Sequence, residues 1–176
     1  DRRADTEAVD REQLIQLLGM TVLNNRIAGR AARPGSPFVG GQAAAIPDLM
    51  NSASLTQIGI AAAPEKWSEA LAAIAEEQRQ TLAGPISTEE VQRARTQLLT
   101  QFEAAAQSAA TRRNEDIANG LIKAVDENQL VTSPEQDFAF AKAVLGEVQV
   151  TDVSQALKAA FSGQGPILFR SKIGRA

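Results

Sequence analysis

The chain has 176 residues, of which 44% are hydrophobic, and this suits one domain with its own hydrophobic core. Its formal charge of −3 and its pI near 5.1 argue against a general nucleic-acid binder, which normally carries a basic balance. The sequence has no histidine and no cysteine, so neither the usual zinc sites nor a histidine-dependent nucleophile can be built within it. No apolar run approaches the roughly 18 residues that a membrane-spanning helix needs.

The N-terminal part of the sequence predicts a lead-in followed by a long helix. Residues 1–10 are highly charged and lack a hydrophobic period, so we interpret them as a lead-in segment to a single domain over residues 11–176. Asp1 in place of a methionine indicates a processed product or an excised piece. The first helix is expected to reach about Ala32 and to end near Pro34, because a proline ring clashes with the preceding helical turn.

Strand signals are weaker than helix signals, because the segments concerned are rich in alanine. Three strands are expected, at residues 37–46, 52–62 and 166–170. The first two are joined by a turn around residues 47–51. If they form a hairpin at a sheet edge, an extended peptide could pair with it, and proline at Gln42 or Ala44 would remove a backbone donor there.

The remaining segments carry helix start signals. The expected helices begin near Pro64, Ser87, Asn114, Ser133 and Thr151. Trp67, Leu71 and Ile74 are expected to form the inward face of the helix that starts at Pro64. Ser87 and Glu90 have the spacing of a capping box, in which each side chain binds the backbone N–H of the other residue.

The resulting order of elements is α-β-β-α-α-α-α-α-β. Because strands do not alternate with helices, a parallel sheet is disfavoured, and the fold class expected is α+β. We expect an antiparallel β-sheet with several helices packed mainly on one face. Three strands make a thin sheet for so many helices, which suggests that upstream sequence contributes at least one more.

Charged side chains offer few candidates for chemistry. Arg26, Arg30 and Arg33 share one helical face and could bind substrate carboxylates or backbone carbonyls. Alternatively, they are simply favourable cations at the C-terminal end of a helix dipole. Adjacent acidic pairs such as Glu76 and Glu77 are expected to be solvated or to face a helix dipole, since their side chains diverge on a helix.

Two segments, residues 18–41 and 64–99, carry a likeness to a known family. The residues that match its motifs are Leu23, Asn24 and Arg26 in the first segment, and Gly84, either Ser87 or Thr88, Glu89, Glu90, Ala94 and Arg95 in the second. From about residue 11 to residue 170, the chain resembles the pitrilysin/insulinase family of zinc metallopeptidases, of the mitochondrial processing peptidase type. It is similar to the second α/β subdomain of one half of such a protein.

The resemblance implies a larger parent protein that encloses a chamber for unfolded peptides. Family members hydrolyse peptides with zinc held by an inverted His-x-x-Glu-His motif and a downstream Glu, and that motif lies in the preceding subdomain. Zinc is therefore the cofactor expected in the parent, whereas this chain is expected to have no catalytic residue, no metal ligand and no cofactor. The partners implied are the zinc-binding subdomain, the other half of the parent and a peptide substrate. The resemblance favours the bacterial periplasm as the compartment of the parent protein.

The resemblance also points to two substrate-contact residues. Active members use an Arg and a Tyr from the other half to hold the substrate. Arg30 lies near the place for this Arg, and the following strand offers Phe38, while the chain contains no Tyr. We therefore expect Arg30 and Phe38 to contact substrate, and it stays open whether the chain belongs to an active or a degenerate half.

The function expected is that of a non-catalytic subdomain of a zinc-dependent metallopeptidase, which helps to form the peptide-binding chamber. An alternative is that the chain is part of an inactive family paralogue that acts as a binding or partner subunit. An unrelated helical adaptor is a third hypothesis. An upstream His-x-x-Glu-His motif would favour the enzyme, and its absence the partner subunit.

Overall fold

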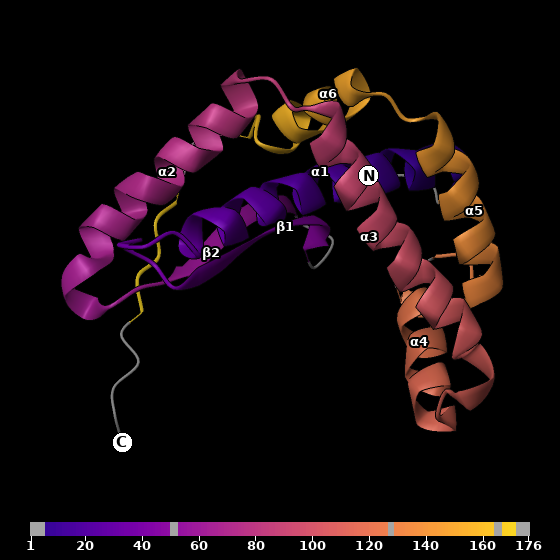
Figure 1. Cartoon of the computed structure of the whole chain (residues 1–176). Coiled ribbons are helices and arrows are strands. Elements are labelled where there is room, and N and C mark those ends of the chain that lie inside the picture. The colour runs from indigo at the N-terminus through magenta and orange to yellow at the C-terminus, as the bar shows by residue number, and fades with distance from the viewer. Residues whose placement is uncertain (1–5, 50–52, 127–128, 164–166, 172–176) are drawn as a thin grey trace.

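The computed structural model describes residues 6–49, 53–126, 129–163 and 167–171. Its elements are α1 (Glu7–Ala31), β1 (Gly40–Leu49), β2 (Ala53–Ala61), the 3-10 turn η1 (Pro64–Lys66), α2 (Trp67–Ala83), α3 (Thr88–Gln107), the 3-10 turn η2 (Ala109–Thr111), α4 (Asn114–Asp126), α5 (Pro134–Glu147) and α6 (Val150–Ala160) (Figure 1). None of the helices described is long and apolar enough to cross a bilayer. The order α-β-β-α confirms the first part of the expected sequence of elements.

Helix α1 starts earlier than the hydrophobic period alone predicts. Thr6 is its N-cap, and the Thr6 hydroxyl accepts a hydrogen bond from the Val9 N–H at 3.4 Å. Glu7 and Asp10 lie in the first turn, where their negative charges face the positive end of the helix dipole. Residues 7–10, which the sequence suggested were a lead-in, are therefore the first turn of the helix.

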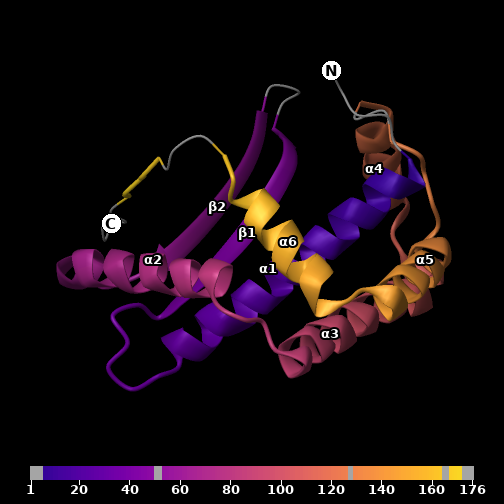
Figure 2. The same cartoon turned by 90° about the horizontal axis from the view of Figure 1, so that it is seen from above.

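The two strands form an antiparallel hairpin, which confirms the α+β fold class. In its register, Ala43 faces Ile58, and Gly41 faces Ile60. Strand β1 continues to Leu49, so part of the turn expected at 47–51 belongs to the strand, and residues 50–52 lie outside the described residues. Helix α1 packs on β1, and α2, α3, α5 and α6 contact α1 (Figures 1 and 2).

The core is organised around α1, which contacts β1 and four other helices. Leu18, Leu23 and Ile27 are fully buried, as their helical spacing predicts. At Gly19, a Cβ atom would lie only 2.8 Å from Leu157 Cγ of α6. The absence of a side chain at this glycine lets the two helices approach closely.

Two glycines of α1 give a matched test of this packing. We expect Gly19→Ala to lower the free energy of unfolding by about 1 kcal/mol, because overpacking costs about 1–3 kcal/mol and helix propensity returns about 1 kcal/mol. Gly29→Ala should raise it by up to about 1 kcal/mol, because no atom lies within 4 Å of the added Cβ. Denaturant unfolding of both variants measures the difference, and equal effects would contradict the close α1–α6 contact.

The inward face of α2 differs from the one the sequence predicted. Ile74 is buried as expected, and Leu71 packs against the core. Trp67, however, is 42% exposed, and the Arg170 guanidinium lies 4.7 Å from the centre of its ring. Trp67 is the first residue of α2. The buried face of α2 instead includes smaller residues that follow it, among them Ala70 and Ala73.

The strand expected at 166–170 is not found in the part of it that the structure describes. Residues 167–170 have no regular secondary structure, and Ile167 and Phe169 are 96% and 86% exposed. The sheet therefore has two strands among the described residues. A β-prone sequence becomes a strand only when a neighbouring strand offers backbone hydrogen bonds, and the described chain brings none to this segment.

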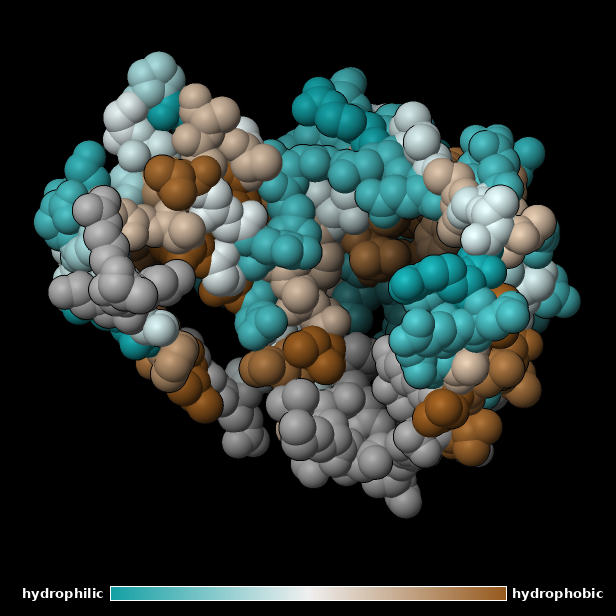
Figure 3. Space-filling model, turned by 90° about the horizontal axis from the view of Figure 1, so that it is seen from below, coloured by the Kyte–Doolittle hydropathy of each residue, from teal (hydrophilic) through white to brown (hydrophobic). Residues whose placement is uncertain are grey.

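Helix α4 also keeps an apolar face in solvent. It lies at the far end of the limb formed with α3 and α5 (Figure 1). Its exposed large hydrophobic residues are Ile117, Leu121, Ile122 and Val125. Seen from below, hydrophobic surface gathers at the end of the molecule that carries α4, beside a hollow (Figure 3).

Candidate functional site

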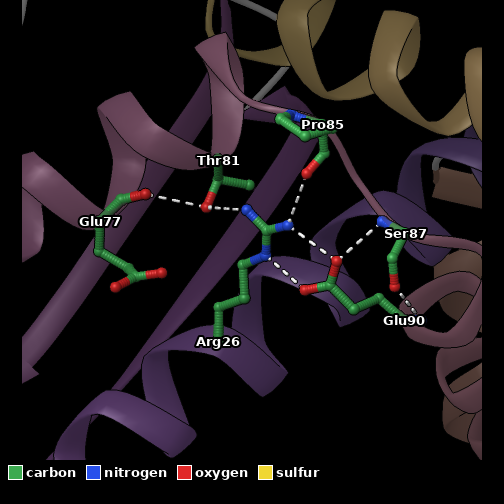
Figure 4. A network of polar contacts seen from close by, with 6 residues as sticks. All are labelled: Arg26, Glu77, Thr81, Pro85, Ser87 and Glu90. Carbon is green, nitrogen blue, oxygen red and sulfur yellow. Dashed lines mark hydrogen bonds and ion pairs between the residues drawn. The ribbon is translucent and has the colours of Figure 1, made fainter.

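The arginine face of α1 takes part in a polar network that reaches α2 and α3 (Figure 4). Arg26 binds Glu90 of α3 through two hydrogen bonds, from Nε to Oε1 at 2.6 Å and from Nη2 to Oε2 at 2.8 Å. Nη2 also donates to the carbonyl oxygen of Pro85 at 3.1 Å, and Nη1 donates to the Thr81 hydroxyl at 3.3 Å. Arg26 thus joins α1, the end of α2 and the start of α3, because its planar fork can serve three partners at once.

Glu90 has a second role in this network. It is the N3 residue of the capping box of α3, and its Oε2 accepts the Ser87 N–H at 2.9 Å, while the Ser87 hydroxyl accepts the Glu90 N–H at 3.2 Å. The hydrogen bond from Arg26 is the main cause that lowers the pKa of Glu90 below its ordinary value. The same pair raises the pKa of Arg26. Both groups are therefore charged at neutral pH. The charged pair acts as a clamp that holds α1, α2 and α3 together.

Arg30 lies one turn further along α1 and faces α2. Its Nη1 is 3.5 Å from Oε2 of Glu77, a long contact, and its Nε is buried without a hydrogen-bond partner among the described residues. Glu77 is only 7% exposed, so the expectation that it is solvated is wrong. Its place three residues after Ile74 and four before Thr81 puts it on the inward stripe of α2, and that spacing could have revealed its burial.

A groove of about 390 Å³ runs beside the network. Its lining includes Arg26, Arg33, Arg93, Glu77 and Glu90. Arg33 and Arg93 are exposed, while Arg26 is already satisfied by its partners. The groove therefore mixes both signs of charge and offers hydrogen bonds to a polar chain such as a peptide.

Phe38 lies in the hydrophobic core and not in the polar network of the arginines. Its side chain is 1% exposed and belongs to the hydrophobic core, and its carbonyl oxygen accepts a hydrogen bond from the Ser36 hydroxyl at 2.9 Å. The turn before it uses Gly35 at φ 78°, a conformation that suits glycine. The structure thus places Arg30 in a half-buried ion pair and the Phe38 ring in the core. Substrate contact by either residue stays a prediction.

Asn24 has a structural role that the sequence alone does not reveal. Its amide Nδ2 donates to the carbonyl oxygen of Ala43 at 3.0 Å, and its Oδ1 accepts the Ala43 N–H at 2.6 Å. Since the Ala43 groups point to Asn24, the neighbouring N–H groups of Gln42 and Ala44 face β2. Proline at those two positions would therefore break the hairpin itself, which corrects the expectation that they lie on a free edge.

The described part of the chain offers no site that fits a zinc ion. Within the described residues there is no group of three or more Asp, Glu, His or Cys that could hold a metal ion. The sequence also lacks the imidazole and thiolate donors that zinc prefers.

Comparison with known proteins rests on structure alone. No family model matches the chain, and no curated protein matches its sequence. The periplasmic protease PqqL from Escherichia coli has a segment that superposes on 89% of this chain with a TM-score of 0.77 and 18% identity. A predicted insulinase family protease from Yersinia pestis matches 87% of this chain, with a TM-score of 0.67 and 13% identity. This chain has the fold of part of an insulinase-type protease.

This chain corresponds in length to only a part of the Escherichia coli and Yersinia proteins. The chain spans 17% of the PqqL chain, 33% of the first half of PqqL solved separately, and 32% of the Yersinia protein. A protein from Bordetella pertussis Tohama I, described as a zinc protease, matches 89% of this chain with a TM-score of 0.60 and 19% identity. In that case the match covers 82% of the Bordetella chain.

Proposed function

We propose that this chain is a non-catalytic subdomain of a zinc metallopeptidase of the pitrilysin/insulinase type, and that it forms part of the wall of a peptide-binding chamber. The observation that carries the proposal is the match of nearly the whole chain to a small part of a much longer protease. The lack of histidine and cysteine supports a role without metal ligands of its own. In this proposal, zinc is held by another subdomain of the parent, and the periplasm is its compartment.

Arg30 is the residue that we propose to contact the peptide. Its contact with Glu77 is long, and its side chain is 25% exposed, so the solvent-facing part of the guanidinium retains donors for a carbonyl oxygen. Phe38 would act by holding the start of β1 in place, since its ring is in the core.

Metal analysis and a peptidase assay test the function. We expect the 176-residue chain alone to bind no stoichiometric zinc and to leave a quenched fluorescent peptide uncut. The natural polypeptide that contains it should bind zinc and cut the peptide, and a chelator should abolish the cutting. Turnover by the isolated chain would contradict the proposal.

Two arginine variants of the natural polypeptide test the proposed contact. Arg30→Gln should lower kcat/KM by about tenfold, since a hydrogen bond to a charged group is worth roughly 1.5 kcal/mol or more. Arg11→Gln is the matched control near the other end of α1, where Arg11 forms an exposed ion pair with Glu147 at 3.2 Å, and it should leave kcat/KM within about twofold. If Arg30→Gln changes only the melting temperature, Arg30 is merely the partner of Glu77.

The alternative is an inactive paralogue that pairs with an active partner. It would give a natural polypeptide that has this fold, binds the peptide and neither holds zinc nor cuts. The sequence upstream of the chain separates the two, because the active enzyme needs the His-x-x-Glu-His motif there.

A further inference from the structure

Two arginines in the groove beside the Arg26 clamp have no anionic partner of their own. Arg33 of α1 and Arg93 of α3 line the same groove of about 390 Å³, and both side chains are exposed. Neither guanidinium makes a hydrogen bond or an ion pair with another described residue. Each arginine therefore retains its five N–H donors for a ligand that enters the groove.

The two glutamates of the groove are already engaged elsewhere. Both carboxylate oxygens of Glu90 accept hydrogen bonds from Arg26, and Oε2 accepts a further one from the Ser87 N–H (Figure 4). Glu77 is only 7% exposed and pairs with Arg30. Because the lining holds three arginines and two glutamates, the groove has an excess of positive charge.

The floor of the groove is open because α1 has a glycine there. Asn25, Gly29 and Arg33 line the groove at intervals of four residues, so they lie along one stripe of α1 about 12 Å long. Beyond the adjacent residues and the backbone of α1, nothing lies within 4 Å of the position that a Cβ at Gly29 would take. The Asn25 amide bonds to no other described residue and adds donors at the opposite end of the stripe. The groove thus has free space between two sets of donors.

A carboxylate is the anion that matches this charge and these donors. The planar fork of an arginine binds a carboxylate through two parallel hydrogen bonds. A doubly charged phosphate would fit the same fork, but it would be repelled more strongly by the two glutamates in the lining. A single negative charge is therefore favoured over a double one.

We propose that Arg33 and Arg93 bind a carboxylate of the peptide substrate, so that the groove is a subsite that favours an acidic residue over its neutral amide. This inference rests on the proposed function, because it takes a peptide as the ligand of the parent protein. The carboxylate comes from an acidic side chain or from the C-terminus of the peptide. Arg30 has a different role, since its proposed contact is a backbone carbonyl, which acidic and neutral residues share.

Binding of three labelled peptides tests the subsite. Each is a short chain of Ala and Ser with one variable residue at its centre: a C-terminally amidated peptide with Glu, the same peptide with Gln, and the Gln peptide with a free C-terminal carboxylate. Fluorescence anisotropy with the natural polypeptide, in the presence of a chelator to prevent cutting, gives the dissociation constants. We expect the Glu peptide to bind at least about fivefold more tightly than the amidated Gln peptide, with a smaller ratio at high salt. Tighter binding of the free-acid peptide alone would identify the terminus as the source of the carboxylate.

Substitutions in the groove separate charge from space. Arg33→Gln and Arg93→Gln should each bring the ratio of the dissociation constants below about twofold. Gly29→Leu should do the same without a change of charge, because its side chain would occupy the open floor. Arg79→Gln is the matched control, since Arg79 forms an exposed ion pair outside the groove, and it should leave the ratio unchanged. Arg30→Gln should weaken the Glu and Gln peptides equally.

The subsite and the proposed function can fail separately. Equal binding of all the peptides, or binding of none, would overturn the subsite, and cutting of the quenched peptide by the same polypeptide would leave the peptidase standing. A preference for Glu that persists in Arg33→Gln and Arg93→Gln would place the carboxylate elsewhere and contradict the proposal. A preference that depends on these arginines, in a polypeptide that does not cut, would support the subsite and refute the peptidase.

Discussion

Phe38→Ala should lower the free energy of unfolding of this chain by about 3–5 kcal/mol, the cost of removing a large buried aromatic side chain. Phe38 is among the largest fully buried side chains, and it anchors the start of β1 to the core under α1. For a chain of this length, the melting temperature should fall by roughly 10 °C or more. Thermal and urea unfolding followed by circular dichroism measure the effect.

Two further phenylalanine variants make this result specific. Phe169→Ala removes the same side chain at a site that is largely exposed, and it should change the stability of this chain by less than about 0.5 kcal/mol. Phe38→Leu preserves much of the volume and should cost about 1.5 kcal/mol or less. If Phe38 instead contacts substrate through its ring, Phe38→Ala would leave stability unchanged and weaken peptide binding by the natural polypeptide.

Arg26→Met is expected to have the second largest effect, a loss of about 2–3 kcal/mol. The substitution retains an apolar stem but leaves the Glu90 carboxylate and the Pro85 carbonyl without their partner in a half-buried place. Removing one member of such a pair costs more than the pair itself contributes, because the remaining charge stays desolvated. Urea unfolding gives the difference in free energy directly.

Arg79→Met is the matched control for Arg26→Met. Arg79 also binds a glutamate, Glu76, through two hydrogen bonds of 2.7 and 2.9 Å, but this pair lies on the exposed face of α2. An exposed pair contributes little, so we expect no measurable change in the free energy of unfolding. Equal losses at the two sites would mean that burial does not set the strength of the Arg26 pair.

The pH dependence of stability provides an independent readout of the Arg26 pair. Because Arg26 lowers the pKa of folded Glu90, the unfolded state binds more protons below pH 4.5, the ordinary value, and stability rises with pH in that window. The contribution is complete above about pH 4.5 and is lost as the pH falls through the lowered pKa. Arg26→Met and Glu90→Gln should both flatten this acid limb, and their double mutant should add little more.

The residues that carry the family resemblance turn out to have structural work in this chain. Asn24 closes the edge of β1, and Arg26 and Glu90 clamp three helices together. Ala94 is fully buried, and Arg95 donates to the Val148 carbonyl at 2.8 Å, which fixes the end of α5 on α3. These motif residues therefore make contacts that hold the fold together.

Local signals in the sequence determined most of the elements. Ser87 with Glu90 and Ser133 with Gln136 form the capping boxes that their spacing predicts, and Gly84 ends α2. The helical period also identified Leu18, Leu23 and Ile27 as core. These features depend on residues three or four apart, so they can be read without knowing the tertiary structure.

Only the tertiary structure decided which side chains are available for function. Arg26 binds Glu90, which lies 64 residues further along the chain. This contact distinguishes Arg26 from Arg30 and Arg33, although the sequence places all three on one helical face. The burial of Phe38 and the exposure of Trp67 likewise depend on how the helices pack on one another and on the hairpin. The β-prone segment 167–170 has no strand partner in the described chain, because strand formation needs hydrogen bonds from elsewhere. Long-range contacts of this kind leave no periodic trace in a sequence.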